Sequence, residues 1–257
     1  MFLCILSFTV VAFLIPLKSR VVSADWEVTS WLLGRTLQSI SNQTDSNHRT
    51  FVVCHEAPSG LPKSVLGGVE FVYCDFSPPA AKTGAAMGSD KVAKLRKGLE
   101  RIEGTDASHV MKLDADDLID NRLCSFVAHT DADLTVCRSG LIVGAKVGHF
   151  CVHERENFHR VCGSSAIYRS ELLNASDGVL RQYFLSDDHQ TVIETAQAKG
   201  LSIATPPFPA VCYVQSTGFR LSNAYHPDFK PTLRYRLGAL RRSRIVTQAT
   251  RMHFGYC

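Results

Sequence analysis

The 257-residue sequence has no large excess of charge of either sign, and its formal net charge at pH 7 is +4. A charge this small does not by itself indicate a nucleic-acid partner, and we expect none. The sequence also lacks a P-loop, an internal repeat and a low-complexity stretch, which excludes the P-loop nucleotidases and the repeat architectures. With 45% hydrophobic and 20% charged residues, it is typical of a globular chain that buries a sizeable core.

The N-terminal run Met1 to Leu17 is apolar and has two interpretations. It lacks the basic residues that begin a signal peptide, although Val22-Ser23-Ala24 would pass as a cleavage site, and it is marginal in length for a membrane span. We favour a first core strand over Val10 to Ile15, because the sheet otherwise lacks a first strand. A signal or anchor, which would account for the surplus apolar residues Met1 to Phe8, is the alternative.

Disulfides are not expected, although the sequence contains nine cysteines. The number is odd, and several cysteines lie inside apolar runs typical of strands, namely Cys54, Cys74, Cys137 and Cys212. Buried free thiols in a reducing compartment explain this pattern better than a framework of bridges. We therefore expect a cytoplasmic protein.

The first half of the chain alternates between runs typical of strands and runs typical of helices. The expected elements are, in order, the strand Val10 to Ile15, a helix from Trp26 to about Ile40 capped by Asp25, the strands Thr50 to Cys54 and Val69 to Cys74, a loop from Ser77 to Gly88, a helix from Asp90 to about Glu103 capped by Ser89, and a strand that ends near Leu113. Such alternation predicts an α/β fold with a mainly parallel sheet and helices on its faces.

The second half of the chain is less regular. The expected elements are, in order, a short strand Leu134 to Cys137, a hairpin within Gly140 to Gly148, a glycine turn at Gly163 before a strand and a helix near Ser170 to Leu173, a helix that opens near Leu185 to His189 and runs to Lys199, and strands over Leu201 to Ala204 and Val211 to Val214.

Three carboxylates follow the apolar run Val110 to Leu113 within four residues, at Asp114, Asp116 and Asp117. The run predicts a buried strand, and ligands of open α/β sheets bind at the carboxyl ends of strands. Carboxylates crowded there repel one another unless a cation joins them, and a hard divalent ion that carries phosphates fits best. A solvated acidic turn is the alternative interpretation.

Two other kinds of acidic site are excluded by the residues that follow. An EF-hand loop needs an oxygen ligand and a glycine where Leu118 and Ile119 stand. A phosphatase nucleophile of the Asp-x-Asp-x-Thr type would have its threonine in place of Leu118 and would normally follow the first strand. The acidic stretch therefore predicts a metal and diphosphate site.

A second acidic pair opens the expected helix of the second half, at Asp187-Asp188-His189. Negative charge is favourable at a helix N-terminus, which is the simplest explanation of the pair. Ser186 can cap that helix on its own, however, so two further acids and a histidine are more than capping requires.

With these residues in place, the sequence resembles the GT-A glycosyltransferases of the family 2 type. The resemblance covers most of Val10 to Lys199 and is carried by four features. They are the strand that ends in Ile15-Pro16-Leu17-Lys18 before the helix that closes on Leu37 to Gln43, the strand that ends in acidic Glu56, the stretch Lys112-Leu113-Asp114-Ala115-Asp116-Asp117, and the pair Asp187-Asp188. The resemblance implies a GT-A (Rossmann-like) fold, with a mainly parallel sheet flanked by helices and an irregular C-terminal acceptor part.

The resemblance also implies a domain organisation and a reaction. Residues 1–229 would form the glycosyltransferase domain, with a nucleotide-sugar half at about 9–120 and an acceptor half at about 121–229. The enzyme would move a sugar from a nucleotide-diphosphate sugar to a hydroxyl of a glycan or lipid-linked acceptor. It would use Mn²⁺ or Mg²⁺ and would invert the anomeric configuration.

Roles of individual residues follow from their positions in the family pattern. The residues expected to line the nucleotide are Pro16, Leu17, Glu56, Asp75 or Lys94, and Asp114. The residues expected to hold the metal are Asp116, Asp114 and, as a third ligand, His226, with His253 as the next candidate. Asp188 would take the proton of the acceptor hydroxyl with support from Asp187, and the turn at Gly163 would lie near the donor sugar or the acceptor.

The C-terminal segment, residues 230–257, is strongly basic from Lys230 to Arg251. Its arginines are interleaved with apolar residues, among them Leu237 and Ile245. Two interpretations remain open: a membrane-surface helix, which would give peripheral contact at the inner face of the membrane, and a solvated helix packed on the sheet.

Two other functions are alternatives to glycosyl transfer. A sugar-nucleotidyltransferase would carry a glycine-rich loop after the first strand, and Pro16 to Arg20 contains no glycine. A non-catalytic nucleotide- or sugar-binding protein of the same fold stays open, since a fold alone does not fix an activity. It is favoured by His55-Glu56-Ala57, which stands where family members usually carry an Asp-Gly-Ser-like turn.

Overall fold

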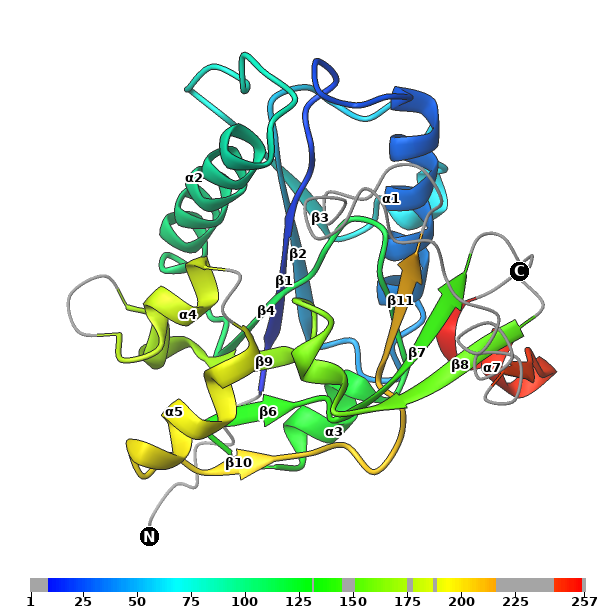
Figure 1. Cartoon of the computed structure of the whole chain (residues 1–257), viewed down its shortest axis with the longest axis vertical. Helices are drawn as coiled ribbons and strands as arrows, with labels where there is room; N and C mark the ends of the chain where they lie inside the picture. The colour runs from blue at the N-terminus through cyan, green and yellow to red at the C-terminus, as the bar shows by residue number, and fades with distance from the viewer. Residues whose placement is uncertain are drawn as a thin grey trace, which may run out of the picture.

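The structure is a computed structural model of the chain, and it describes residues 9–130, 132–144, 151–174, 178–186, 189–215 and 243–255. Within these residues the larger sheet has seven strands in the order β10-β6-β9-β4-β1-β2-β3 (Figure 1). They are β1 (Val11–Pro16), β2 (His48–Cys54), β3 (Val69–Tyr73), β4 (His109–Lys112), β6 (Leu134–Val136), β9 (Ala166–Arg169) and β10 (Ile203–Ala204). Only the two pairs made by β9 are antiparallel among these strands, so the expected mainly parallel sheet is confirmed.

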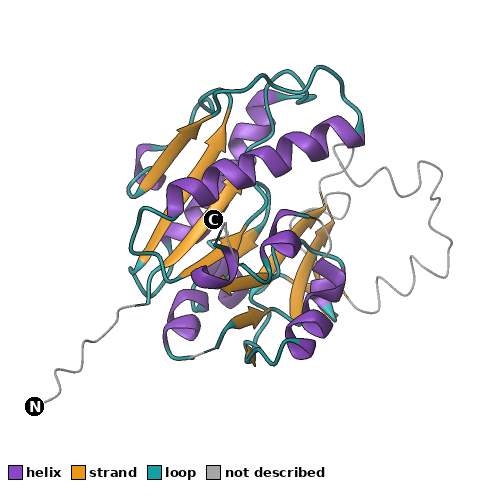
Figure 2. Cartoon of the chain, turned by 90° about the vertical axis from the view of Figure 1, so that its left-hand side faces the viewer, coloured by secondary structure: helices purple, strands orange, loops and turns teal. Residues whose placement is uncertain are grey.

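Helices cover both faces of this sheet (Figure 2). The described α-helices are α1 (Trp26–Ser41), α2 (Gly84–Ile102), α3 (Leu123–Ala128), α4 (Arg181–Leu185), α5 (Val192–Ala198) and α7 (Gln248–Phe254). Leu33 of α1 belongs to the same buried cluster as Phe13 of β1, while Leu95 of α2 belongs to the cluster of Leu14. Because side chains alternate along a strand, β1 lies between two apolar layers, and α4 and α5 share the layer of α2.

A second sheet of five described strands, in the order β12-β8-β7-β11-β5, continues from the first. Its strands are β5 (Leu118–Ile119), β7 (Ser139–Gly144), β8 (Cys151–Glu156), β11 (Val211–Gln215) and β12 (Ser243–Ile245). β7 and β8 pair antiparallel, so a hairpin is present, but it extends beyond the expected Gly140 to Gly148 because β8 begins at Cys151. Residues 145–150 lie outside the described residues. Short 3₁₀ turns complete the described chain, at η1 (Lys63–Val65), η3 (Phe158–Arg160), η4 (Ser170–Leu173) and η5 (His189–Thr191).

The two long helices of the first half differ in how well their ends were predicted. Asp25 caps α1 as expected, since its side chain accepts a hydrogen bond of 3.0 Å from the backbone N–H of Val28. The prediction for the start of α2 is wrong, because the helix begins at Gly84 and is capped by Thr83 rather than Ser89. The glycines of this stretch indicate a loop, because each costs a helix about 1 kcal/mol relative to alanine. The helix starts here nonetheless, and the side chain of Thr83 caps it by accepting a hydrogen bond of 3.2 Å from the backbone N–H of Ala86.

The predicted single helix from near residue 185 to Lys199 is also wrong. α4 ends at Leu185, and Ser186 is its C-cap in an extended conformation instead of the N-cap of the next helix. The helix resumes as η5 and α5, and the N-cap of α5, Thr191, makes no side-chain capping bond. Gly200 follows α5 with a φ of 70°, and this left-handed residue ends the helix as expected.

The described end of the basic segment packs on the second sheet. Arg244 and Ile245 lie in β12, which pairs antiparallel with β8, so a membrane-surface helix does not extend over them. Residues 230–242 lie outside the described residues.

In the part of the chain that the structure describes, no helix combines the length and the apolar composition needed to cross a membrane. Six cysteines are free thiols, namely Cys54, Cys74, Cys124, Cys137, Cys162 and Cys212, and all of them except Cys74 are buried.

Candidate functional site

The acidic stretch forms the crossing between the two sheets. β4 ends at Lys112 and β5 begins at Leu118, so Asp114, Asp116 and Asp117 lie in the turn that joins the strands. β4 runs parallel to β1 and pairs with it directly, and the turn therefore follows the carboxyl end of a central strand. This is the edge at which ligands of open α/β sheets bind.

The acidic turn is fixed by hydrogen bonds to its own backbone and to α1. The backbone N–H of Asp117 donates to the carbonyl oxygen of Asp114 over 3.1 Å. The hydroxyl of Thr36, on α1, donates to the carbonyl oxygen of Ala115 over 2.9 Å. The turn is therefore a rigid platform for its carboxylates.

Asp117 points into the core and fastens the turn to a second segment. Its side chain is fully buried, and its Oδ2 accepts hydrogen bonds from the hydroxyl of Ser164 at 2.6 Å and the thiol of Cys162 at 3.4 Å. The same Ser164 oxygen accepts the backbone N–H of Asp114 at 2.9 Å. Burial, together with the charges of the neighbouring acids, raises the pKa of Asp117 well above its ordinary value. Asp117 is thus a structural clasp.

Asp114 and Asp116 remain partly exposed and differ in charge balance. Burial acts to raise the pKa of Asp114, but the ammonium groups of Lys91 and Lys112 hold it below its ordinary value. Lys91 forms an ion pair of 2.8 Å with Asp114 Oδ1. Burial raises the pKa of Asp116 to about 6. The Asp114 carboxylate also raises this pKa, whereas the nearby ammonium of Lys18 lowers it. Burial is thus the main reason that the charged form of Asp116 is disfavoured, and the Asp114 carboxylate adds to it.

Gly163 lies close to the acidic turn. A Cβ placed on Gly163 would lie 3.9 Å from Oδ2 of Asp114, 3.9 Å from Cε of Lys112 and 4.0 Å from Nδ1 of His189. Lys112 is buried, and its ammonium donates to the carbonyl oxygen of Ser186 over 3.0 Å. Gly163 thus lies between an acid and a lysine of the β4 end and an imidazole from a distant segment.

The segment after β1 is held from both sides at Leu17. Its backbone N–H donates to the carbonyl oxygen of Val53 over 2.9 Å, and its carbonyl oxygen accepts the ammonium of Lys94 over 2.8 Å. Lys94 is only 1% exposed and also bonds Asp90 at 2.6 Å. Of the expected nucleotide contacts here, the Leu17 side chain is buried in the core, and Pro16 is partly exposed.

Glu56 follows β2 and reaches the same segment. Its Oε1 accepts the backbone N–H of Arg20 at 3.2 Å, whereas its Oε2 is buried and has no hydrogen-bond partner among the described residues. His55, beside it, bonds Asp90 of α2 at 2.7 Å, which fixes the end of β2. A buried acceptor left without a partner costs free energy, and a ligand that donates a hydrogen bond would satisfy it.

Asp75 lies at a different face of α2 from Lys91. Its side chain is 80% exposed and forms an ion pair of 2.9 Å with Lys97. Together with Phe76 and Arg96 it lines an open groove of about 650 Å³ along α2. The lining of this groove includes none of the other described candidate residues.

Asp187, Asp188 and His226 lie outside the described residues. Ser186 and His189, the described residues on either side of Asp187 and Asp188, both lie near the acidic turn. The carbonyl oxygen of Ser186 accepts the ammonium of Lys112, and His189 lies beside Gly163.

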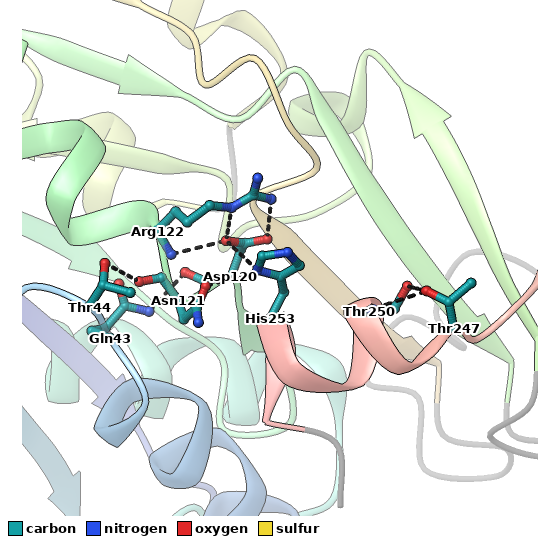
Figure 3. A network of polar contacts seen from close by, with 8 residues as sticks. All are labelled: Gln43, Thr44, Asp120, Asn121, Arg122, Thr247, Thr250 and His253. Carbon is teal, nitrogen blue, oxygen red and sulfur yellow. Dashed lines mark hydrogen bonds and ion pairs between the residues drawn. The ribbon is translucent and has the colours of Figure 1, made fainter.

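His253, the next candidate for a third metal ligand, belongs to a separate polar network (Figure 3). Its Nδ1 lies 3.0 Å from the side-chain oxygen of Asn121 and 4.0 Å from Oδ1 of Asp120. Asp120 is almost fully buried, and Arg122 neutralises it with an ion pair of 2.7 Å. The network docks α7 at the far end of β5, so His253 has a structural role there.

The acid pair fits a metal that carries phosphates. Within the described residues, no three or more His, Cys, Asp or Glu side chains are arranged to hold a metal ion. Mg²⁺ and similar ions that carry a diphosphate need only one or two carboxylates, because phosphate and water oxygens fill the other positions. Asp114 and Asp116, both partly exposed in the turn after β4, could supply such oxygens.

Sequence reasoning gave no role to three residues of this site. They are Asp90, Lys112 and His189. The spacing of Asp90 and Lys94 by four residues in one helix indicates an ion pair. A lysine at the end of a buried apolar strand is likewise a local signal, whereas the position of His189 over Gly163 depends on tertiary packing.

No protein-family model matches the sequence, and no curated protein matches it. Solved structures of S. aureus TarS are similar to the chain. TarS 1–349 in complex with UDP-GlcNAc is 12% identical with a TM-score of 0.48, and the match covers 84% of this chain and 62% of that one. TarS 1–349 in complex with UDP is 12% identical with a TM-score of 0.47, over 81% and 61%. The chain thus spans about three-fifths of the length of these structures.

Proposed function

We propose that the protein is a glycosyltransferase of the GT-A type that moves a sugar from a nucleotide-diphosphate sugar to an acceptor hydroxyl. The proposal is carried by one observation: Asp114 and Asp116 follow the carboxyl end of a central strand, with the lysines of three segments around them. These are Lys18 after β1, Lys91 on α2 and Lys112 on β4. A site for a nucleotide diphosphate needs carboxylates that bind a divalent ion and ammonium groups that bind the phosphates.

On the donor side, Asp116 and Asp114 would hold Mn²⁺ or Mg²⁺ on the diphosphate. When bound, the ion would stabilise the negative charge that develops on the leaving diphosphate. Lys18 would stabilise the same charge. Glu56 would accept a hydrogen bond from the base or the ribose beside Pro16.

Three further donor-side residues have less direct roles. Lys94 would hold the backbone of Leu17 in place, because its ammonium already bonds that carbonyl oxygen. Asp75 and His226 remain predicted contacts of the nucleotide and the metal.

On the acceptor side, we propose Asp188 as the base and Asp187 as its support. A positioned base contributes typically ~10²–10⁴ in rate. The proposal rests on the sequence resemblance and is supported by Ser186 and His189, which lie at the acidic site. An inverting mechanism and a glycan or lipid-linked acceptor follow from the same resemblance. A cytoplasmic location, with the basic segment at the inner face of the membrane, remains a prediction.

The proposal is tested by thermal shift with UDP, GDP, CMP and dTDP sugars, each with and without Mn²⁺. A ligand that binds only the folded state raises the midpoint of unfolding. We expect a metal-dependent rise with one nucleotide class, lost in Asp116→Asn. The matched control is Asp106→Asn, which removes an exposed carboxylate paired with Arg49. No rise with any nucleotide sugar would refute the proposal.

A non-catalytic binding protein is the second candidate. It is supported by the stretch His55-Glu56-Ala57, which stands where family members usually carry an Asp-Gly-Ser-like turn. Slow hydrolysis of the bound nucleotide sugar without acceptor distinguishes the two functions, because a binding protein would leave the donor intact. Hydrolysis that is lost in Asp116→Asn supports the transferase.

A further inference from the structure

The first turns of α2 present three charged side chains to the site: Asp90, Lys91 and Lys94. Asp90 and Lys94 bond each other at 2.6 Å, and their other bonds go to His55 and to the backbone after β1. These partners are internal, and the side chains of Asp90 and Lys94 are 8% and 1% exposed. Lys91 differs, because its ion pair of 2.8 Å is with Asp114, an acid of the proposed metal site.

We infer that Lys91 is an exchangeable counter-ion, which neutralises Asp114 in the ligand-free protein and passes to the diphosphate when a divalent ion binds Asp114. The inference rests on the function proposed above and deepens it. It predicts that metal and nucleotide bind with positive coupling through one lysine.

The metal half of the exchange follows from the position of the ion pair. The ammonium of Lys91 contacts Oδ1 of Asp114, and a divalent cation on the same carboxylate would be repelled by it. Binding of the metal alone therefore has to break the pair, and this cost weakens the affinity. The side chains of Lys91 and Asp114 are 21% and 32% exposed, so the pair separates without opening the core.

The nucleotide half of the exchange follows from the chemistry of lysine. Its ammonium is a compact charge on a flexible stem, and it binds phosphate as a point charge. A diphosphate held by the metal offers the released Lys91 a new partner. The cost of breaking the ion pair is recovered only when both ligands are present, and such a coupling is necessarily reciprocal.

The test measures two affinities of Lys91→Met by titration calorimetry. One is for Mn²⁺ alone, and the other, with saturating Mn²⁺, is for whichever of UDP, GDP, CDP and dTDP shifts the wild type most. We expect Mn²⁺ alone to bind about fivefold tighter or more, and the nucleoside diphosphate about fivefold weaker or more. Lys91→Arg, which keeps the charge, should stay close to wild type for both ligands.

The control is Arg101→Met, which breaks an ion pair between the last turn of the same helix and Glu70 of β3. It should change neither affinity. Weaker binding of both ligands in Lys91→Met would give Lys91 a structural role and overturn the exchange. Tighter Mn²⁺ binding with unchanged nucleotide affinity would overturn the passage to the diphosphate. A wild type that binds neither Mn²⁺ nor any of the nucleotides would instead overturn the proposed function, and this inference with it.

Discussion

The ammonium of Lys112 and the carbonyl oxygen of Ser186 are joined by a hydrogen bond of 3.0 Å that links the end of β4 to the end of α4. Lys112 precedes Asp114 by two residues, and Ser186 directly precedes Asp187. A buried ammonium costs free energy unless it is paired, and an apolar side chain would fill the same space more cheaply. We therefore expect the charge of Lys112 to position the end of β4 relative to the end of α4, and so the proposed donor side relative to the proposed acceptor side.

We expect Lys112→Met to fold with unchanged or raised stability, because an apolar chain replaces a buried charge. Turnover should fall by about 10²-fold, since a misplacement of about 1 Å at a reacting group costs this much. Single-turnover transfer, or donor hydrolysis, gives the rate, and calorimetry gives the nucleotide affinity. Lys199→Met, at an exposed lysine, is the control. A loss of affinity as large as the loss of rate would contradict the positioning role.

Ser164 and Ser165 form a matched pair for testing the clasp at Asp117. Both are fully buried, but Ser164 bonds Asp117 and the backbone of Asp114, while the Ser165 hydroxyl has no partner among the described residues. Ser164→Ala should lower the free energy of unfolding by about 1–3 kcal/mol, because two buried polar groups lose their partner. Ser165→Ala should lower it by less than about 0.5 kcal/mol. Urea denaturation measures both, and equal losses would argue against the clasp.

Glu56→Gln tests the buried Oε2 atom as a nucleotide contact. The variant keeps an oxygen for the backbone N–H of Arg20 but loses the charged acceptor. We expect the nucleotide to bind about tenfold more weakly, in line with the worth of a hydrogen bond to a charged group. Stability in the absence of ligand should change little. Glu27→Gln, at an exposed residue of α1, is the control, and unchanged nucleotide affinity in Glu56→Gln would remove Glu56 from the site.

His159 should make the protein less stable in mild acid. Burial lowers its pKa, and the neighbouring Arg138 and Arg160 act in the same direction. The unfolded chain therefore binds the proton first, and stability is lost as the pH falls through the unfolded value near 6.5, until the folded protein is protonated as well. The loss for one proton is at most about 1.4 kcal/mol per pH unit.

Urea unfolding of the wild type and His159→Gln between about pH 7.5 and about pH 5.5 measures this effect, because the variant has no proton to bind at this position. The free energy of unfolding should fall less in the variant than in the wild type. His48, whose pKa burial also lowers, is present in both proteins and cancels. Identical pH dependences would show that His159 does not contribute.

The elements with strong local signals were predicted well. α1 starts at the expected Trp26 and ends at Ser41, because an N-cap and an apolar helical period both mark it. β5 and β12 were not predicted as strands, since they are two and three residues long and are defined by distant partners. Leu118 of β5, for example, pairs with Cys212.

In the candidate site, too, the features with a local sequence signal were predicted, and those that depend on tertiary contacts were not. The acidic turn at the end of a central strand was predicted, because the apolar run and the carboxylates are adjacent in sequence. Its supports were not, because they come from segments far along the chain. Ser164 lies 50 residues from Asp114, and Ser186 lies 74 residues from Lys112. No local pattern reports such contacts.

Gly98 determines how far α2 stands from β1. A side chain at this position would overlap the side chain of Leu14, so the helix can lie this close to Leu14 only with a glycine here. Lys91 lies two turns earlier, about 10 Å along the same helix. Because the length of a lysine side chain limits its reach, the ion pair of Lys91 with Asp114 depends on how far the helix stands from the sheet. Gly98, on the buried side of α2, thus helps to set whether the ammonium of Lys91 can reach the acidic turn.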